Sequence, residues 1–441
     1  MKTLRSQELF EQAQAHIPAG TSNPARTFRQ VGGRSPIFMR QGKGAYLHDV
    51  DGNSYIDYIV GWGPLILGHA HPEVVASLNA QIERGTSFGT PTEQELTLAQ
   101  MIKKALPSID MLRFVNSGTE ATMAAVELAK VHTRRERIIK FKGCYHGWYG
   151  PLLTGSPYRP IENSTGQVLI AEYNDLESVD KLLRSYKGEI AGVIVEPVAG
   201  NMGVVPPSDG FLQGLRDLCD AHESLLIFDE VMTGFRVAYG GAQGQFRVTP
   251  DITCLGKIIG GGLPIGAYGG RDDIMESVAP SGSMYQGGTY SGNPFSAAAG
   301  IATLQLLEKP DMYKQLEYRT KALCTSIKAH ADELAVPLCI NQVGAMFCMF
   351  FQEGPVTNLD TVQCSDTKAF ARFFWEMLER GIYLPPSQFE AAHLSVMHTS
   401  DDIKRTSQAA REALRVVADL RTSEQGYGEA RSVKEAGKNL N

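Results

Sequence analysis

Short apolar runs and helical patterns alternate along the chain from about residue 72. The apolar runs predict buried strands at 113–116, 137–141, 192–197 and 225–229. Segments with apolar residues every three to four positions predict helices at 73–83, 93–106, 120–132 and 210–222. Strands that alternate with helices of this length are typical of an α/β fold built on a mostly parallel, doubly wound sheet.

The pattern differs at both ends of the chain. Near the start, Asp51-Gly52 lies between alternating apolar residues and predicts a hairpin turn. After about residue 307 we expect a helix at 322–335, strands within 344–351, and helices at 367–379 and 400–420. The expected parts are an N-terminal arm with part of a small domain (1–70), a large cofactor-binding domain (71–308), a small α+β domain (309–420) and a polar flexible tail (421–441).

Composition excludes several classes of function. The 441 residues are 43% hydrophobic, which allows a large core in more than one domain. A net charge of −6, without a basic stripe carrying aromatic residues, argues against nucleic-acid binding. No apolar run is long enough for a membrane span, and the start lacks the apolar core of a signal peptide. Seven scattered cysteines without paired spacing predict no metal site and a reduced, cytoplasmic protein.

Lys257 is the first candidate for chemistry. It follows a short apolar run and precedes the cluster Gly260-Gly261-Gly262. An amine that is partly desolvated has a lowered pKa and can attack an aldehyde cofactor, and the small neighbours leave room for a ring. A surface lysine on a glycine loop explains the segment about equally well.

Asp229 is the second candidate. The run Leu225-Leu226-Ile227-Phe228 predicts a buried parallel strand that carries Asp229 at its carboxyl end, where open α/β sheets bind their ligands. A carboxylate there can keep the pyridine nitrogen of pyridoxal phosphate protonated, and this pairing accompanies a cofactor-binding lysine. Alone, a capping acid after an ordinary strand, Asp229 or Glu230, is the better interpretation.

A third group lies where a strand turns into a helix. Ser117, Gly118 and Thr119 combine free backbone N–H groups, hydroxyls and the positive end of a helix dipole, which suits a phosphate. An ordinary helix N-cap would use the same hydroxyls. Other glycine clusters suggest a P-loop or dinucleotide enzyme, but neither Gly-x-Gly-x-x-Gly after the first strand nor a Walker lysine motif occurs. The combination of the three groups favours pyridoxal phosphate.

The chain resembles the class III, fold-type I aminotransferases from about residue 19 to about residue 411, and most strongly the aminomutases of glutamate-1-semialdehyde. The matching segments are 23–28, 62–64, 68–72, 116–121, 143–147, 196–201, 228–236, 255–270, 286–294 and 384–391. The resemblance implies a seven-stranded-type, mostly parallel sheet in the large domain and a small α+β domain formed by both chain ends.

The resemblance also implies a role for each matching residue. Lys257 would bind the cofactor covalently and move the substrate proton, and Asp229 would pair with the pyridinium nitrogen. Val231 and Tyr145 would cover the two ring faces. Ser117, Gly118 and Thr119 would hold the phosphate, together with Thr289 of a second subunit, which requires a homodimer. Arg26 would bind the substrate carboxylate, and the rest of the pocket would be formed by Ser22, Trp62, His146, Asn201 and Glu390.

The chain departs from the aminomutase pattern in three places. The segment 148–158 and the connection after it replace a longer gating loop. Lys142 stands where the pattern has a glutamate, and Ala392-His393 replaces Gly-Phe.

The altered segment bears on which reaction is catalysed. An aminomutase must retain its diamino intermediate, and an incomplete gate would release it and favour transamination between molecules. Neutral loop drift in a working aminomutase is the other interpretation. We slightly favour a transaminase of a small carboxylated amino compound, with the aminomutase as the alternative. A catalytically silent paralogue is disfavoured because Lys257 and Asp229 are both present.

Overall fold

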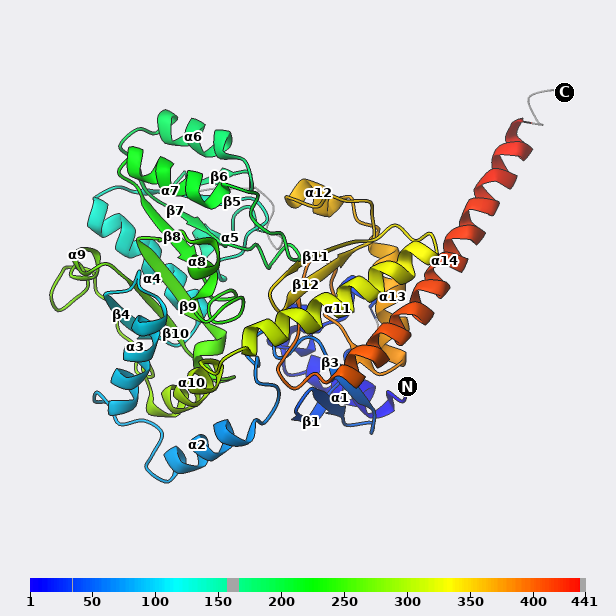
Figure 1. Cartoon of the computed structure of the whole chain (residues 1–441), viewed down its shortest axis with the longest axis horizontal. Helices are drawn as coiled ribbons and strands as arrows, with labels where there is room; N and C mark the ends of the chain where they lie inside the picture. Colours follow the sequence, from blue (N-terminus) through cyan, green and yellow to red (C-terminus); the bar gives the residue numbers. More distant parts are fainter. Residues whose placement is uncertain (34, 157–165, 437–441) are drawn as a thin grey trace.

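A seven-stranded sheet forms the centre of the larger part of the molecule, on the left in Figure 1. The computed structural model describes residues 1–33, 35–156 and 166–436, with side chains up to residue 421. The strand order is β4 (Met111–Val115), β10 (Gly266–Gly270), β9 (Ile252–Gly256), β8 (Leu225–Asp229), β7 (Ile190–Val195), β5 (Arg137–Phe141), β6 (Val168–Ala171). Only β10 runs antiparallel to its neighbours among these strands, so the predicted mostly parallel α/β sheet is confirmed.

Continuous burial explains the apolar strands. Every residue of β7, β8 and β9 is buried, because helices cover both faces of the sheet. The helices of this part are α2 (Pro72–Ile82), α3 (Glu93–Ala105), α4 (Gly118–Thr133), α5 (Gly150–Leu153), α6 (Leu176–Ser185), α7 (Phe211–Ala221), α8 (Gly241–Phe246), α9 (Asp272–Met275) and α10 (Pro294–Leu307). The short 3₁₀ helix η4 (Lys257–Gly260) directly follows β9.

Two smaller sheets combine segments that are distant in sequence. The first has the order β1 (Met39–Lys43), β2 (Tyr46–Asp49), β3 (Ser54–Asp57), β13 (Ile382–Tyr383), and its last pair is parallel. The second has the order β11 (Cys339–Val343), β12 (Met346–Phe350), β14 (Ala392–His393). Pairing of β3 with β13 brings segments from the two ends of the chain into one sheet.

Helices surround these sheets on the right in Figure 1. They are α1 (Leu4–Gln14), η1 (Pro18–Gly20), η2 (Pro24–Arg26), η3 (Arg29–Val31), α11 (Met312–Glu333), α12 (Leu359–Gln363), α13 (Thr367–Glu379) and α14 (Ser400–Ala436). Helix α11 begins ten residues before the predicted start at 322, because Leu316 and Thr320 already lie on its buried face. Helix α14 continues beyond the predicted end at 420, so residues 421–436 of the expected flexible tail are helical. This stretch contains Glu, Arg and Ala, which favour helices, although it also contains two glycines.

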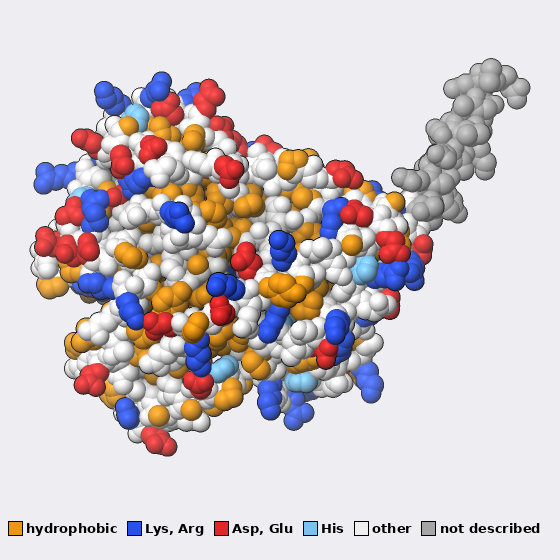
Figure 2. Space-filling view, viewed as in Figure 1, with side chains coloured by type: hydrophobic (Ala, Val, Ile, Leu, Met, Phe, Trp, Pro, Cys, Tyr) orange, Lys and Arg blue, Asp and Glu red, His pale blue; other side chains and the backbone are white. Residues whose placement is uncertain are grey.

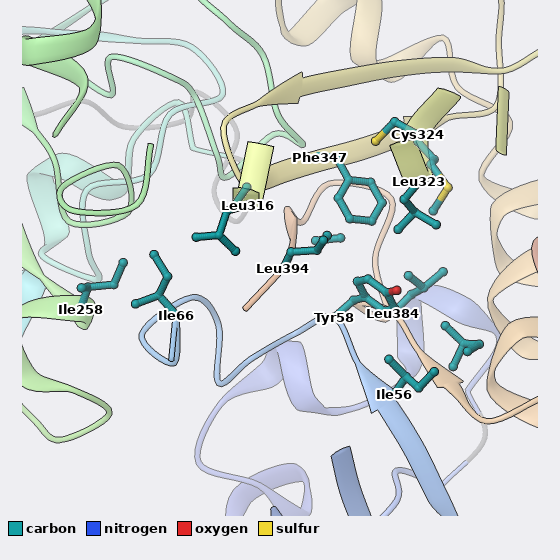
Figure 3. Packing of buried hydrophobic residues seen from close by; sticks show 14 of the residues in the cluster. Ile56, Tyr58, Ile66, Ile258, Leu316, Leu323, Cys324, Phe347, Leu384 and Leu394 are labelled. Atoms are coloured by element: carbon teal, nitrogen blue, oxygen red, sulfur yellow. The ribbon is translucent and has the colours of Figure 1, made fainter. Parts of the chain in front are cut away.

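One hydrophobic cluster connects the larger and smaller parts (Figure 3). Ile258, the residue after the candidate Lys257, belongs to the same buried cluster as Ile66, Leu316 and Leu394. Burial of such side chains stabilises the fold by roughly 1.5–3 kcal/mol each. The cluster therefore anchors the segment that carries Lys257 against both ends of the chain.

Acidic and basic side chains are interspersed on the face shown in Figure 2. Within residues 1–33, 35–156 and 166–436, no helix combines the length and the apolar composition needed to cross a bilayer.

Candidate active site

Asp229 and Lys257 lie at the carboxyl ends of two adjacent parallel strands. Asp229 ends β8, Lys257 follows β9, and Asp229 is in register with Cys254. Lys257 has a φ of 49°, a left-handed conformation that is uncommon for residues other than glycine. Such strained residues concentrate at functional sites, where the surrounding structure holds them in place.

The amino end of α4 lies at the same edge of the sheet. Since β10 is antiparallel to both β4 and β9, these two strands run in the same direction, and α4 begins just after β4. The Ser117 hydroxyl accepts a hydrogen bond from the Glu120 N–H at 3.2 Å, so Ser117 is the N-cap of this helix. Gly118, Thr119 and Thr122 line the cavity in front of it.

Two glycines permit close contacts in this region. A Cβ built on Gly118 would lie 2.6 Å from Val231 Cγ1, and one on Gly147 would lie 2.6 Å from Thr119 Oγ1. Both distances are far below a van der Waals contact, so neither position accepts a side chain without rearrangement. These glycines allow the residues that follow β8, the loop after β5 and the start of α4 to lie close together around one cavity.

Asp229 is held by a buried histidine. His146 Nδ1 lies 2.7 Å from Asp229 Oδ2, and the other carboxylate oxygen, Oδ1, accepts a hydrogen bond from the Val231 N–H at 3.1 Å. The His146 side chain is fully buried, and its Nε2 has no partner among the described residues. His146, expected to line the substrate pocket, instead lines the cofactor cavity and orients the Asp229 carboxylate.

Glu196 organises the neighbouring loops. It follows β7, and its carboxylate accepts hydrogen bonds from the N–H groups of Tyr145 and Gly200, each at 2.7 Å, and from the Asn201 side chain at 3.1 Å. Its burial raises the pKa of this carboxyl above the ordinary value. Glu196 thus fixes Tyr145 and Asn201, two predicted pocket residues, relative to the sheet.

Glu230 has a structural role. Its carboxylate accepts hydrogen bonds from the N–H groups of Ala242 and Gln243 at the start of α8, from the Gln243 side chain and from the Thr233 hydroxyl. Of the two acids that end the apolar run, Glu230 therefore anchors α8, and Asp229 faces the cavity.

The site consists of two adjoining cavities that share Tyr145, Asn201, Met232 and Lys257. The first, of about 220 Å³, is lined by Gly118, Thr119, Thr122, Tyr145, His146, Gly147, Glu196, Asn201, Asp229, Val231, Met232 and Lys257. The second, of about 360 Å³, is lined by Asn23, Pro24, Ala25, Trp62, Tyr145, Trp148, Leu153, Asn201, Met232, Lys257, Glu390 and His393. We call the first the cofactor cavity and the second the substrate cavity.

The electrostatic environment makes Lys257 reactive. Burial lowers the pKa of its amine, and the charge of Arg236 acts in the same direction, although Glu390, Glu196 and Asp229 oppose them. Arg236 is itself buried, donates to the carbonyls of Leu394 and Gly63, and has its pKa lowered to about 9 by burial. A larger fraction of Lys257 is therefore in the neutral, nucleophilic form.

The residues predicted to bind the substrate do not all line the same cavity. Trp62, Asn201 and Glu390 line the substrate cavity with Lys257. Ser22 and Arg26 instead line another cavity, of about 470 Å³, which shares only Trp62 with the substrate cavity. Thr289 is exposed and lines neither the cofactor cavity nor the substrate cavity.

The residues that depart from the aminomutase pattern lie in different places relative to the site. Lys142 points away from the site: its ammonium lies 2.8 Å from Asp360 Oδ1 and 3.3 Å from Glu172 Oε1. Trp148 and Leu153 contribute to the substrate cavity, and 76% of Trp148 remains exposed. His393 lies inside the substrate cavity. Residues 157–158 of the altered segment lie outside the described residues.

Several site residues were not identified from the sequence: Glu196, Thr122, Met232, Asn23 and Leu153. Glu196 could have been found, because it follows a buried apolar strand just as Asp229 does. The other four carry no local signal, since their place in the cavities depends on how distant segments pack.

The cofactor cavity fits pyridoxal phosphate. It combines an amine (Lys257), a buried carboxylate (Asp229), an aromatic ring (Tyr145) and a helix amino end with threonine hydroxyls. His146, whose buried Nε2 has no partner among the described residues, lines the same cavity. Within the described part of the chain, no group of three or more His, Cys, Asp or Glu side chains could hold a metal ion.

Comparison with known proteins gives the same assignment. Residues 28–407 match the family model of the class III aminotransferases. The chain is 52% identical over 425 residues to a glutamate-1-semialdehyde 2,1-aminomutase of Desulforamulus reducens, which covers 94% of this chain and 98% of that protein. A Roseiflexus castenholzii protein of the same name is 52% identical and covers 95% of this chain and 98% of its own.

Solved structures share the fold. An omega-transaminase from Sphaerobacter thermophilus has a TM-score of 0.89 at 30% identity, covering 95% of this chain and all of that one. A glutamate-1-semialdehyde aminomutase from Pseudomonas aeruginosa has a TM-score of 0.85 at 25% identity, covering 94% of each chain. The chain therefore belongs to the class III aminotransferases, enzymes that depend on pyridoxal phosphate.

Proposed function

We propose that this enzyme converts glutamate-1-semialdehyde into 5-aminolevulinate by moving an amino group between neighbouring carbons. The observation that carries the proposal is 52% identity, over 94% of this chain, to a protein named as that aminomutase. The altered segment 148–158 favoured transamination between molecules. The ion pairs of Lys142 with Glu172 and Asp360 remove one argument for the transaminase, because this reversed charge does not line either cavity.

The chain's own residues would perform distinct tasks. Bound pyridoxal phosphate supplies a ring that withdraws electrons from the reacting substrate carbon. Asp229, oriented by His146, would balance the positive charge of the ring nitrogen. Lys257 Nζ would move the proton between the substrate carbon and the cofactor, since burial lowers the pKa of the amine and so favours the neutral form that acts as a base. Thr119 and the start of α4 would hold the phosphate, with Val231 and Tyr145 on the ring faces.

Substrate binding would use the outer end of the site. Glu390, Asn201 and Trp62 surround the space beside Lys257. Arg26 remains our candidate for the substrate carboxylate, supported by the Trp62 wall that its cavity shares with the substrate cavity. A contact between Arg26 and the substrate therefore requires the carboxylate to extend past Trp62.

We further propose a homodimer in which Thr289 reaches the phosphate of the partner subunit. The exposed position of Thr289 supports this arrangement, as do the neighbouring Tyr285 and Tyr290, which are 86% and 63% exposed. The seven unpaired cysteines support the proposed cytoplasmic location.

A single-substrate assay tests the proposed reaction. The purified enzyme with its cofactor is given glutamate-1-semialdehyde alone, and 5-aminolevulinate is measured over time. We expect efficient conversion without a second substrate, because the amino group returns to the same molecule. Conversion that requires a separate amino donor and acceptor would contradict the aminomutase.

Intermolecular transamination is the second candidate. The Sphaerobacter thermophilus omega-transaminase favours it, since its TM-score of 0.89 exceeds the 0.85 of the Pseudomonas aeruginosa aminomutase. The same assay separates the two reactions when a keto acid acceptor is added in a parallel sample. Only a transaminase would form its amino product in proportion to the acceptor.

A further inference from the structure

The turn that carries Trp62 has an unusual backbone. Four consecutive residues have positive φ angles: 43° for Val60, 68° for Gly61, 69° for Trp62 and 102° for Gly63. This left-handed conformation is uncommon for residues other than glycine, and it is an outlier for a β-branched side chain such as that of Val60. Such a conformation persists only where the surrounding structure fixes it. The turn therefore depends on the contacts that hold it.

Asp57, the last residue of β3, supplies two of these contacts. Its Oδ1 accepts a hydrogen bond from the Ile59 N–H at 2.8 Å, and its Oδ2 accepts one from the Val60 N–H at 3.1 Å. The side chain of Asp57 is fully buried, so water does not compete for these bonds. Both donors lie directly before Gly61 and Trp62. The Asp57 carboxylate therefore fixes the start of the strained turn.

His69 in turn fixes the Asp57 carboxylate. His69 Nε2 lies 2.7 Å from Asp57 Oδ2. The backbone N–H of His69 donates to the Gly44 carbonyl at 2.7 Å, and the His69 carbonyl accepts from the Gly44 N–H at 2.8 Å. A Cβ built on Gly42 would lie only 2.5 Å from His69 Nδ1, so the backbone of β1 packs closely against the ring. The hairpin of β1 and β2 thus holds His69, which holds Asp57.

Trp62 lies at the boundary between two cavities. It is the one described residue that lines both the substrate cavity and the cavity of about 470 Å³ that contains Arg26, which we call the Arg26 cavity. Asp57 and His69 line the Arg26 cavity but not the substrate cavity. A ligand whose amine lies beside Lys257 therefore reaches Arg26 only past the indole. The position of Trp62 decides whether a ligand can occupy both cavities at once.

We infer that Asp57 and His69 are positioning residues for Trp62. They hold the indole where a ligand bound beside Lys257 can extend its carboxylate to Arg26. The inference rests on the proposed function, in which the substrate carries both an amino group and a carboxylate. Since neither residue lines the substrate cavity, both act through the turn and not by contact with the reacting atoms. A looser turn weakens the carboxylate contact and leaves binding of the amine end unchanged.

Two ligands that differ only in the carboxylate test this role. The enzyme with bound pyridoxal phosphate is titrated with 5-aminovalerate and with pentylamine, which has the same chain and amine but no carboxylate. Binding is followed by the change in cofactor absorbance for wild type, His69→Ala and His69→Gln. The glutamine amide donates from about the position of Nε2 and so restores the bond to Asp57. His222→Ala is the matched control, since His222 Nε2 lies 3.9 Å from Asp180 and lines none of these cavities.

We expect His69→Ala to weaken binding of 5-aminovalerate about tenfold and binding of pentylamine less than about threefold, because only the first ligand uses Arg26. His69→Gln and His222→Ala should stay within about threefold of wild type for both ligands. Equal changes for the two ligands in His69→Ala, or no change, would overturn the inference. A His69→Gln variant that behaves like His69→Ala would also overturn it.

Tryptophan fluorescence measures the turn itself. In a Trp148→Phe background the remaining indoles are those of Trp62 and Trp375, and Trp375 is only 8% exposed. Adding His69→Ala to this background should make the fluorescence easier to quench with acrylamide, because Trp62 is less firmly held. Unchanged quenching would contradict the role. Thermal unfolding and cofactor content identify loss of the fold, in which case His69→Asn, whose amide is too short to reach Asp57, replaces His69→Ala in both experiments.

The proposed reaction is judged separately, on wild type with glutamate-1-semialdehyde as sole substrate. Wild type that converts this substrate while His69→Ala changes both ligands equally would overturn the positioning role alone. Wild type that does not convert it would overturn the proposed reaction, whereas a preference for 5-aminovalerate that His69→Ala abolishes would still support the positioning role. Wild type that binds both ligands equally would overturn the inference together with the carboxylate role of Arg26.

Discussion

The cofactor cavity and the substrate cavity are adjacent, but they are built in different ways. Asp229, Lys257 and the start of α4 come from one edge of a single sheet, at the ends of β8, β9 and β4. The substrate cavity instead collects Asn23, Trp62, Leu153 and His393 from four segments spread over the chain. The sheet positions the main residues of the cofactor cavity, whereas the substrate cavity forms only when distant segments of the chain pack together.

The two cavities also differ in how deeply their side chains are buried. In the cofactor cavity, the carboxylates of Asp229 and Glu196 are buried and accept several hydrogen bonds from protein groups. In the substrate cavity, Trp148 is 76% exposed. The cofactor end is therefore more enclosed and more extensively hydrogen-bonded than the substrate end. Mutations at the cofactor end should consequently change rates most.

The largest effect is expected for Lys257→Ala. Loss of the amine removes both covalent attachment of the cofactor and the base that moves the substrate proton, so kcat should fall by about 10⁴-fold or more. The fold should persist, apart from the stability that bound cofactor contributes. Steady-state kinetics, together with thermal unfolding of the cofactor-free proteins, measures both effects. Wild-type rates in this variant would remove Lys257 from the mechanism.

A smaller but still large effect is expected for Asp229→Asn. The amide keeps the size of the side chain and removes its charge, so the cofactor should still bind while proton removal slows by roughly 10²–10³-fold. Exchange of the substrate proton in deuterated water measures that step directly. Nearly unchanged exchange would mean that Asp229 only caps the Val231 N–H.

The smallest effect on the chemistry is expected for Lys140→Met, which removes a buried lysine that stabilises the segments forming the cavity walls. The buried ammonium of Lys140 donates to the carbonyls of Cys144, Leu152 and Thr154, and so ties β5 to the segment that carries Tyr145, His146 and Trp148. Without it, three buried carbonyls lose their donor, and the free energy of unfolding at pH 7 should fall by about 2–4 kcal/mol. The matched control Lys142→Met removes only partly exposed ion pairs and should change it by less than about 1 kcal/mol.

The same variant has a pH signature. Burial lowers the pKa of Lys140 to about 8, from an ordinary value of 10.5. Between these values an unfolded chain holds a proton that the folded chain has lost, so this lysine makes wild-type stability rise with pH in that window. Urea unfolding from pH 7 to pH 10.5 should therefore show a steeper rise for wild type than for Lys140→Met. Parallel curves would contradict the shifted pKa.

The sequence by itself determined the elements whose pattern is local. The predicted bounds of β5, β8 and α13 agree with the structure to the residue, because continuous apolar runs and a clear helical period leave little ambiguity. It also placed Asp229, Lys257 and the start of α4 at one site, since strands of a parallel sheet end at the same edge.

Only the tertiary structure decided what surrounds those residues. It paired His146 with Asp229, turned Lys142 towards Asp360, placed Arg26 in a separate cavity and brought His393 beside Lys257. None of these contacts is local, and each depends on the packing of segments that lie up to several hundred residues apart. The periodic pattern of a chain fixes which residues are buried, but which buried residues meet is decided when the whole core closes.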